Sequence, residues 1–157
     1  MYDVLTVADA ILKIAKSKGV SLTPMQLMKL VYIAHGWSLG LRGIDLFRNR
    51  IEAWQYGPVM PDLYHATKQF GRNPIPLHMV GEGPPPVSME DVDFLTDVFD
   101  KYGHLSGPQL SYLTHQSGTP WDTMYHPELR GVEIPDDLIS SHYKDLLRGR
   151  RPMNVGA

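Results

Sequence analysis

Apolar residues recur every three or four positions along most of the chain, which is the period of an amphipathic α-helix. This spacing predicts helices over about residues 7–18, from 24 onward, 61–70, 89–102, 107–115 and 136–147, with a short helical turn near 119–121. In the second helix the apolar positions extend beyond one face, which predicts a central helix buried on several sides. Gly36, Gly40 and Gly43 predict a break or loosening in its second half.

Capping residues mark where several of these helices begin. Thr23-Pro24-Met25-Gln26 places a capping threonine, a proline in the first turn and a glutamine three residues after the cap. This arrangement lets the two side chains bond reciprocally to the backbone. Ser106-Gly107-Pro108-Gln109 repeats the same arrangement, Thr6 is the expected cap of the first helix, and Gly19, Gly71 and Gly103 are the expected stops.

Residues 44–60 have a different pattern. Apolar and polar positions alternate over residues 51–56 and end at Gly57-Pro58, which predicts a short extended segment, with a turn near Asn49. We therefore predict a mainly α protein: a single compact helical domain of about six helices, with a small extended or hairpin segment near residues 44–58. The domain is expected to span residues 1–147, followed by a basic flexible tail over 148–157.

Composition narrows the class of protein. The chain has 157 residues, of which 43% are hydrophobic, and its formal net charge is −2, so a disordered chain is excluded. The absence of cysteine excludes disulfides, thiolate nucleophiles and cysteine-ligated zinc. No apolar stretch is long enough to span a membrane, and the start lacks the features of a secretory signal. We expect a cytoplasmic protein.

No catalytic motif stands out. The sequence contains none of the GxSxG, Walker, GxGxxG or HExxH motifs, so we expect no enzyme activity, no cofactor and no metal site. Two other readings stay open. A hydrolase could use His115, Asp122 and His126 if they converge. A nucleic-acid-binding regulator could use the basic first half, where residues 1–78 carry a balance of +4, although the pI near 6.4 makes nucleic acid an unlikely partner.

Two surfaces are candidates for contact with a partner protein. Trp54, Tyr56 and Tyr64 flank the Gly57-Pro58 turn, and such aromatic residues either fill a core or supply anchor energy in an interface. The second candidate is the acidic helix that bears Asp93, Asp97 and Asp100, which is otherwise a solvated face.

Three stretches resemble the Panacea antitoxin domain family, also called SocA-like or phage-associated GepA-like. Residues 23–34 (TPMQLMKLVYIA) resemble its T-P-x-x-L-x-K-L-x-Y-x-A helix, and residues 51–61 (IEAWQYGPVMP) its I-E-A-W-x-x-G-P-V-x-P segment. His115 and Pro120-Trp121 resemble a later H…P-W element. The motif residues are Thr23, Pro24, Lys29, Leu30, Tyr32, Glu52, Ala53, Trp54, Gly57, Pro58, His115, Pro120 and Trp121.

The resemblance implies a mainly helical protein that neutralises a toxin encoded next to it by direct contact. One member of the family also hands its toxin to the ClpXP protease, so a protease of this type is a candidate second partner. We expect the motif residues to be largely structural, with Glu52 bracing Lys29 or capping a helix and Trp54 filling the core. The toxin contact is then expected on less distinctive residues.

Overall fold

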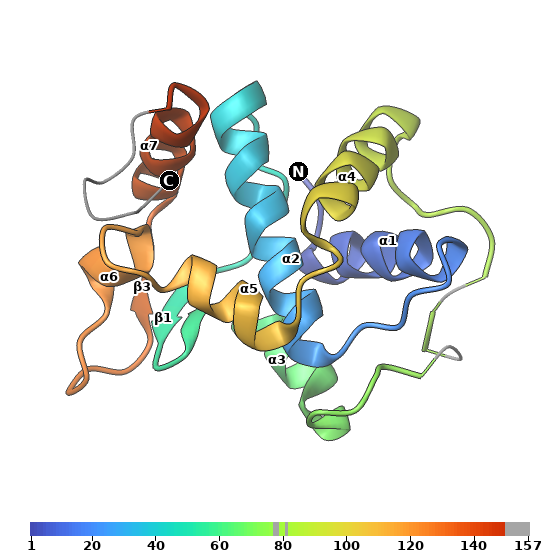
Figure 1. Cartoon of the computed structure of the whole chain (residues 1–157), viewed down its shortest axis with the longest axis horizontal. Helices are drawn as coiled ribbons and strands as arrows, with labels where there is room; N and C mark the ends of the chain where they lie inside the picture. Colours follow the sequence, from blue (N-terminus) through green and yellow to red (C-terminus); the bar gives the residue numbers. More distant parts are fainter. Residues whose placement is uncertain (77–78, 81, 150–157) are drawn as a thin grey trace.

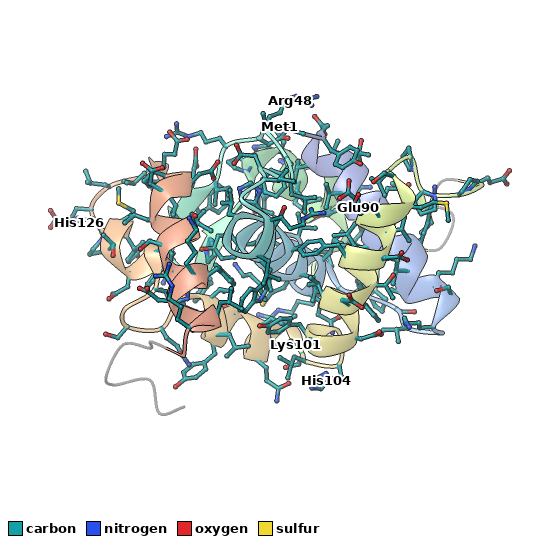
Figure 2. All side chains as sticks on the ribbon, turned by 90° about the horizontal axis from the view of Figure 1, so that it is seen from above. Met1, Arg48, Glu90, Lys101, His104 and His126 are labelled. Atoms are coloured by element: carbon teal, nitrogen blue, oxygen red, sulfur yellow. The ribbon has the colours of Figure 1, made fainter. Side chains whose placement is uncertain are left out.

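One central helix organises the molecule. In the computed structural model, which describes residues 1–76, 79–80 and 82–149, α2 (Pro24–Trp37) packs against α1, α3, α4, α5 and α7. Seen from above in Figure 2, it runs through the middle, with α1 and α4 on one side and α6 and α7 on the other. The other helices are α1 (Val4–Ser17), α3 (Pro61–Thr67), α4 (Met89–Tyr102), α5 (Gly107–Thr114), α6 (Pro120–Met124) and α7 (Asp136–Leu147).

The prediction of a mainly α protein is confirmed (Figure 1). The described part of the chain contains seven α-helices rather than about six, because residues 120–124 form a short helix instead of an isolated turn. None of the helices in the described ranges is long and apolar enough to cross a membrane.

The capping signals at Thr23 and Ser106 both correspond to capping boxes. The Thr23 hydroxyl accepts a hydrogen bond from the Gln26 amide, and the Gln26 side chain accepts one from the Thr23 amide at 2.9 Å. The first helix begins three residues earlier than predicted, because Asp3 rather than Thr6 caps α1. The third helix is shorter than predicted, since the chain tightens into a 3-10 turn over Lys68–Phe70.

The second half of α2 loosens as predicted, and its glycines give room to another helix. The chain passes into a π-helical turn, η1 (Ser38–Arg42). A Cβ at Gly36 would overlap the ring of Tyr143, and one at Gly40 would lie 2.8 Å from the Tyr143 Cβ. Tyr143 belongs to α7, so the two glycines let α7 lie directly against the end of the central helix.

A small antiparallel sheet lies beside the helices in the order β2-β1-β3. The strands are β1 (Glu52–Trp54), β2 (Gly57–Val59) and β3 (Val132–Glu133), with Trp54 opposite Gly57 in the tight turn. Gly57 has a φ of +117°, which strongly favours glycine. The chain bends at Asn49, near the predicted turn, and the Asn49 side chain accepts from the Val4 amide at 2.8 Å and donates to Asp62 at 2.7 Å.

A charged network joins the N-terminus, η1 and α4. Asp91 accepts hydrogen bonds from the Tyr2 hydroxyl at 2.6 Å and from Arg42 at 2.7 Å, and a third from the Ser88 hydroxyl. Burial alone raises the pKa of Asp91, but these hydrogen bonds outweigh it and hold that pKa below the usual value. The network therefore stabilises the fold more when Asp91 is ionised than when it is protonated.

We expect Asp91→Asn to lower the free energy of unfolding by about 1–3 kcal/mol at pH 7, because it weakens hydrogen bonds to a charged group. A folded-state pKa below the unfolded value gives stability that is lost as pH falls through the folded pKa. The difference between wild type and variant should therefore shrink in acid. Urea unfolding at several pH values measures this, with Asp93→Asn on the exposed side of α4 as the control. An effect that does not change toward low pH would contradict the assignment.

Candidate functional site

A groove opens where the first turn of α2, the β1–β2 hairpin and α3 meet. Its volume is about 440 Å³. Apolar side chains make most of its wall: Pro24, Met25, Met28, Trp54, Tyr56, Val59 and Tyr64. Lys29 and Lys68 are its two cations, and Gln55, Thr67 and Gly71 complete the lining, so no carboxylate lines it. We call this feature the aromatic groove.

The rim of the aromatic groove is exposed aromatic surface. Tyr56 at the hairpin turn is 63% exposed, and Tyr64 on α3 is 39% exposed. Trp54 packs edge-on against Tyr64, with ring centroids 4.9 Å apart, and its indole nitrogen donates to Glu52 at 2.9 Å. The structure thus brings the three predicted aromatic residues together: Trp54 is a half-buried wall, while both tyrosines are accessible.

Lys29 is the most unusual residue of the groove. It is 2% exposed, and its Nζ donates to the Pro58 carbonyl at 2.9 Å. Burial lowers the pKa of Lys29 to about 7. The expected contact between Glu52 and Lys29 is wrong. The Glu52 carboxylate instead pairs with Arg50 at 2.8 Å and accepts a hydrogen bond from the Trp54 indole.

Side chains from three helices hold the hairpin in place. The carbonyl of Trp54 accepts from the Trp121 indole of α6, that of Tyr56 from the Ser111 hydroxyl of α5, and that of Pro58 from Lys29 of α2. The carbonyls of three alternate residues along this segment therefore accept hydrogen bonds from side chains of the surrounding helices. The hairpin that carries Tyr56 is consequently a fixed platform.

Most other motif residues are placed where a structural role explains them. Leu30, Tyr32 and Ala53 are core residues, and Thr23 and Pro24 begin α2. Pro120 begins α6, and the His115 ring lies edge-on to Trp121 at 5.3 Å. The motif thus mainly describes the scaffold beneath the groove.

The acidic helix is a separate surface. Asp93, Asp97 and Asp100 are exposed on α4, and Asp100 pairs with Lys18 at 3.1 Å. In Figures 1 and 2, α4 and the hairpin lie on opposite sides of α2. The two sets of predicted contact residues therefore form no continuous surface.

The three residues of the hydrolase hypothesis are bonded separately. His115 Nδ1 contacts the Ser111 carbonyl, Asp122 accepts from the Gly118 amide at 3.0 Å, and His126 Nδ1 accepts from the Glu128 amide at 3.1 Å. Within the described ranges, no hydrogen bond or ion pair joins any two of the three. Figure 2 shows His126 at the outer edge of the molecule.

Cations of the basic first half are largely paired. Lys13, Lys18, Arg42, Arg48 and Arg50 each lie within 4 Å of a carboxylate, at 3.0, 3.1, 2.7, 3.6 and 2.8 Å respectively. Such pairing reduces the positive field that phosphate contacts require. The structure thus adds no support to the nucleic-acid hypothesis.

One cluster in the described part of the chain has the composition of a metal site. Ligand atoms of His35, Asp45 and Asp136 lie within 4.8 Å of one another. His35 Nε2 contacts Asp136 at 2.9 Å, and this bond lowers the pKa of Asp136. A hydrogen bond with Asp136 in turn raises the pKa of Asp45. These bonds link α2, the loop after η1 and the start of α7, which gives the cluster a structural role.

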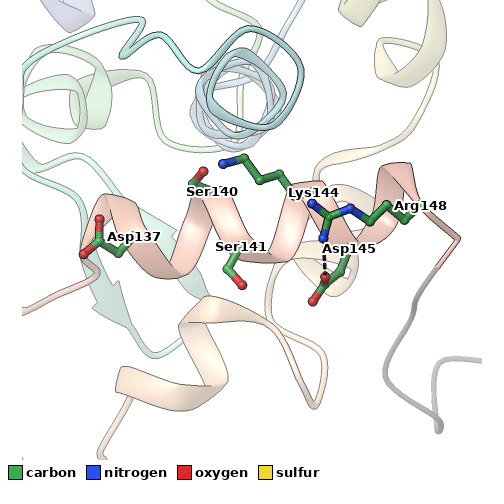
Figure 3. Close-up of a pocket in the computed structure, with 6 residues that line it drawn as sticks. All are labelled: Asp137, Ser140, Ser141, Lys144, Asp145 and Arg148. Carbon is green, nitrogen blue, oxygen red and sulfur yellow. Dashed lines mark ion pairs between the residues drawn. The ribbon is translucent and has the colours of Figure 1, made fainter.

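A second hollow, of about 310 Å³, lies along α7 (Figure 3). Its lining is polar and comes from this one helix: Asp137, Ser140, Ser141, Lys144, Asp145 and Arg148. Arg148 pairs with Asp145 at 3.8 Å. None of these side chains is buried, so this hollow is a weaker candidate than the aromatic groove.

Comparison with known proteins places the chain in a family. Residues 27–122 match the family described as "Antitoxin SocA-like, Panacea domain". The chain belongs to the SocA-like Panacea antitoxin family. It is 30% identical to the curated protein "Antitoxin SocA" of Caulobacter vibrioides (strain NA1000 / CB15N), over 90% of this chain and 82% of that protein. No solved structure matches the chain significantly.

Some residues that line the groove were not predicted from the sequence. Met25, Met28 and Lys68 line it together with the predicted aromatic residues. Met25 lies within the capping box and Met28 three residues later, so the face that they share on the helix was visible in the sequence. That α3 faces this turn of α2 depends on tertiary packing.

Proposed function

We propose that this chain neutralises a toxin protein in the cytoplasm by direct, non-enzymatic contact, and that the aromatic groove is part of the contact surface. Family membership supports the antitoxin role. The observation that carries the choice of surface is the exposed Tyr56 on the fixed hairpin, next to the exposed Tyr64 on α3. Tyr56 and Tyr64 stand at the rim of a largely apolar groove, whose lining includes the buried side chains of Met28 and Val59.

Physical reasons favour this surface over the others. Exposed tyrosine and tryptophan contribute much of the binding energy in protein interfaces, because they bury a large area and lose little conformational entropy. The hairpin is held by three helices, so little further ordering is needed when a partner binds. The acidic helix carries charge, but the ion pair between Asp100 and Lys18 is exposed, and exposed ion pairs contribute little free energy.

Co-expression tests the proposed function. The protein encoded next to this chain is induced in a bacterial host, with and without the chain, and growth is followed. We expect the neighbour to stop growth, the chain to restore it, and both proteins to co-purify. A parallel host without ClpXP separates blocking from degradation. Rescue that requires the protease would indicate an adaptor, and a toxic neighbour that the chain fails to counteract would contradict the proposal.

A further inference from the structure

The aromatic groove contains an unusual combination of groups. Its wall is largely apolar, yet a lysine that is 2% exposed forms part of its lining. A second lysine, Lys68, also lines the groove, and no aspartate or glutamate does. Any segment that fills the groove therefore meets two cations and no anion.

Lys29 has donor capacity that the fold leaves unused. An ammonium group carries three donor hydrogens. The described contacts of Lys29 account for one of them, the bond to the Pro58 carbonyl at 2.9 Å. Gly57 gives this ammonium group room, because a Cβ there would lie 3.0 Å from Lys29 Nζ and 3.4 Å from the Thr114 hydroxyl. A buried cation in the lining of a groove, with donor hydrogens beyond this one bond, is suited to an incoming acceptor, above all a charged one.

We propose that the aromatic groove binds a toxin segment in which an aspartate or glutamate side chain lies next to a bulky apolar residue, with the carboxylate pairing with Lys29. This inference rests on the proposed function and specifies the chemistry of the segment. The apolar side chain packs against Met25, Met28 and Tyr64. The carboxylate supplies the negative charge that the groove lacks.

The pairing makes binding depend on pH. Burial lowers the pKa of Lys29 in the free chain to about 7. A paired carboxylate favours the charged lysine, so binding above pH 7 requires proton uptake. The other titratable groups of the groove are Lys68, Tyr56 and Tyr64, and His65 on α3 lies 3.4 Å from Lys68. Thr114 of α5 adds only a hydroxyl near Lys29.

The probe is a blocked peptide with phenylalanine, aspartate and leucine in sequence, titrated into the ¹⁵N-labelled full chain. A peptide with asparagine in place of aspartate is the matched control. We expect the acidic peptide to bind at least tenfold more tightly at pH 6.5 and to shift the amide signals of Gln55, Tyr56 and Gly71. Above pH 7 the affinity for the acidic peptide should decrease by up to about tenfold for each pH unit. The peptide carboxylate stays ionised over this range, so the decrease reports the protonation of Lys29.

Variants assign the pH dependence to Lys29. Lys29→Met should remove both the preference for the acidic peptide and the pH dependence, while Lys16→Met on the exposed face of α1 and His65→Gln should retain both. If Lys29→Met does not fold, the comparison of the aspartate and asparagine peptides on the wild-type chain still tests the inference. Equal binding of the two peptides, no binding of either, or a pH dependence that survives Lys29→Met would overturn the inference. Growth rescue without this preference would leave the antitoxin role intact and remove only the inference.

Discussion

Tyr143→Ala is expected to lower the free energy of unfolding by about 3–5 kcal/mol, the usual cost of deleting a large buried aromatic side chain. Tyr143 is buried on α7, lies 5.0 Å from the Trp37 ring in an edge-on arrangement, and occupies the space that Gly36 and Gly40 leave open. Its removal leaves a cavity between α7 and the end of α2. Chemical denaturation measures the loss, and Tyr112→Ala, at a 64% exposed tyrosine on α5, is the control.

The contact between Gly36 and the Tyr143 ring predicts that Gly36→Ala changes the free energy of unfolding in opposite directions with and without Tyr143. In wild type, Gly36→Ala should destabilise by about 1–3 kcal/mol, because the added methyl overlaps the Tyr143 ring. In the Tyr143→Ala background it should stabilise, since alanine is favoured over glycine in helices by up to about 1 kcal/mol. A double-mutant cycle gives the coupling. Additive effects would show that α7 does not pack against the end of α2 in this way.

The combined substitution Tyr56→Ala and Tyr64→Ala is expected to weaken toxin binding at least about 100-fold while leaving the fold intact. Each tyrosine is accessible, so its loss creates no buried cavity. Two interface anchors that each contribute about 2 kcal/mol are together sufficient for this effect. Growth rescue and affinity for the toxin measure it.

Two controls make this result specific to the groove. Tyr112→Ala removes a tyrosine outside the groove lining that is as exposed as Tyr56. The triple substitution of Asp93, Asp97 and Asp100 by asparagine removes the charge of the acidic helix. We expect both control variants to neutralise normally. If the acidic-helix variant fails and the tyrosine variant works, the toxin contact lies on α4.

The sequence predicted most of the helices, and it did so best where the boundary depends on local chemistry. Thr23, Ser88 and Ser106 cap helices through residues three positions away, and the side chains needed are adjacent in the sequence. The strand β3 was not predicted, since two residues carry no periodic pattern. Val132–Glu133 exists as a strand only because it pairs with Glu52 and Ala53, far away along the chain.

The site was predictable only in part, for the same reason. The sequence placed a turn at Gly57-Pro58, whereas the structure has it at Gln55-Tyr56 with Gly57 and Pro58 in β2. The shift is two residues, so the sequence still indicated a surface at Trp54 and Tyr56. The sequence did give a sign of Lys29, because it is the one charged residue in the run of residues 27–34. That it lines a groove rather than the solvent face depends on how the hairpin and α3 pack against α2, which local pattern does not contain.

Direct neutralisation is tested most sharply with purified components. The toxin is mixed with this chain in the absence of protease, nucleic acid and other proteins, and both complex formation and toxin activity are measured. We predict a stable complex and loss of toxin activity at stoichiometric amounts of the chain, with the Tyr56→Ala and Tyr64→Ala variant failing in both. A toxin that stays free and active beside an excess of wild-type chain would contradict the account.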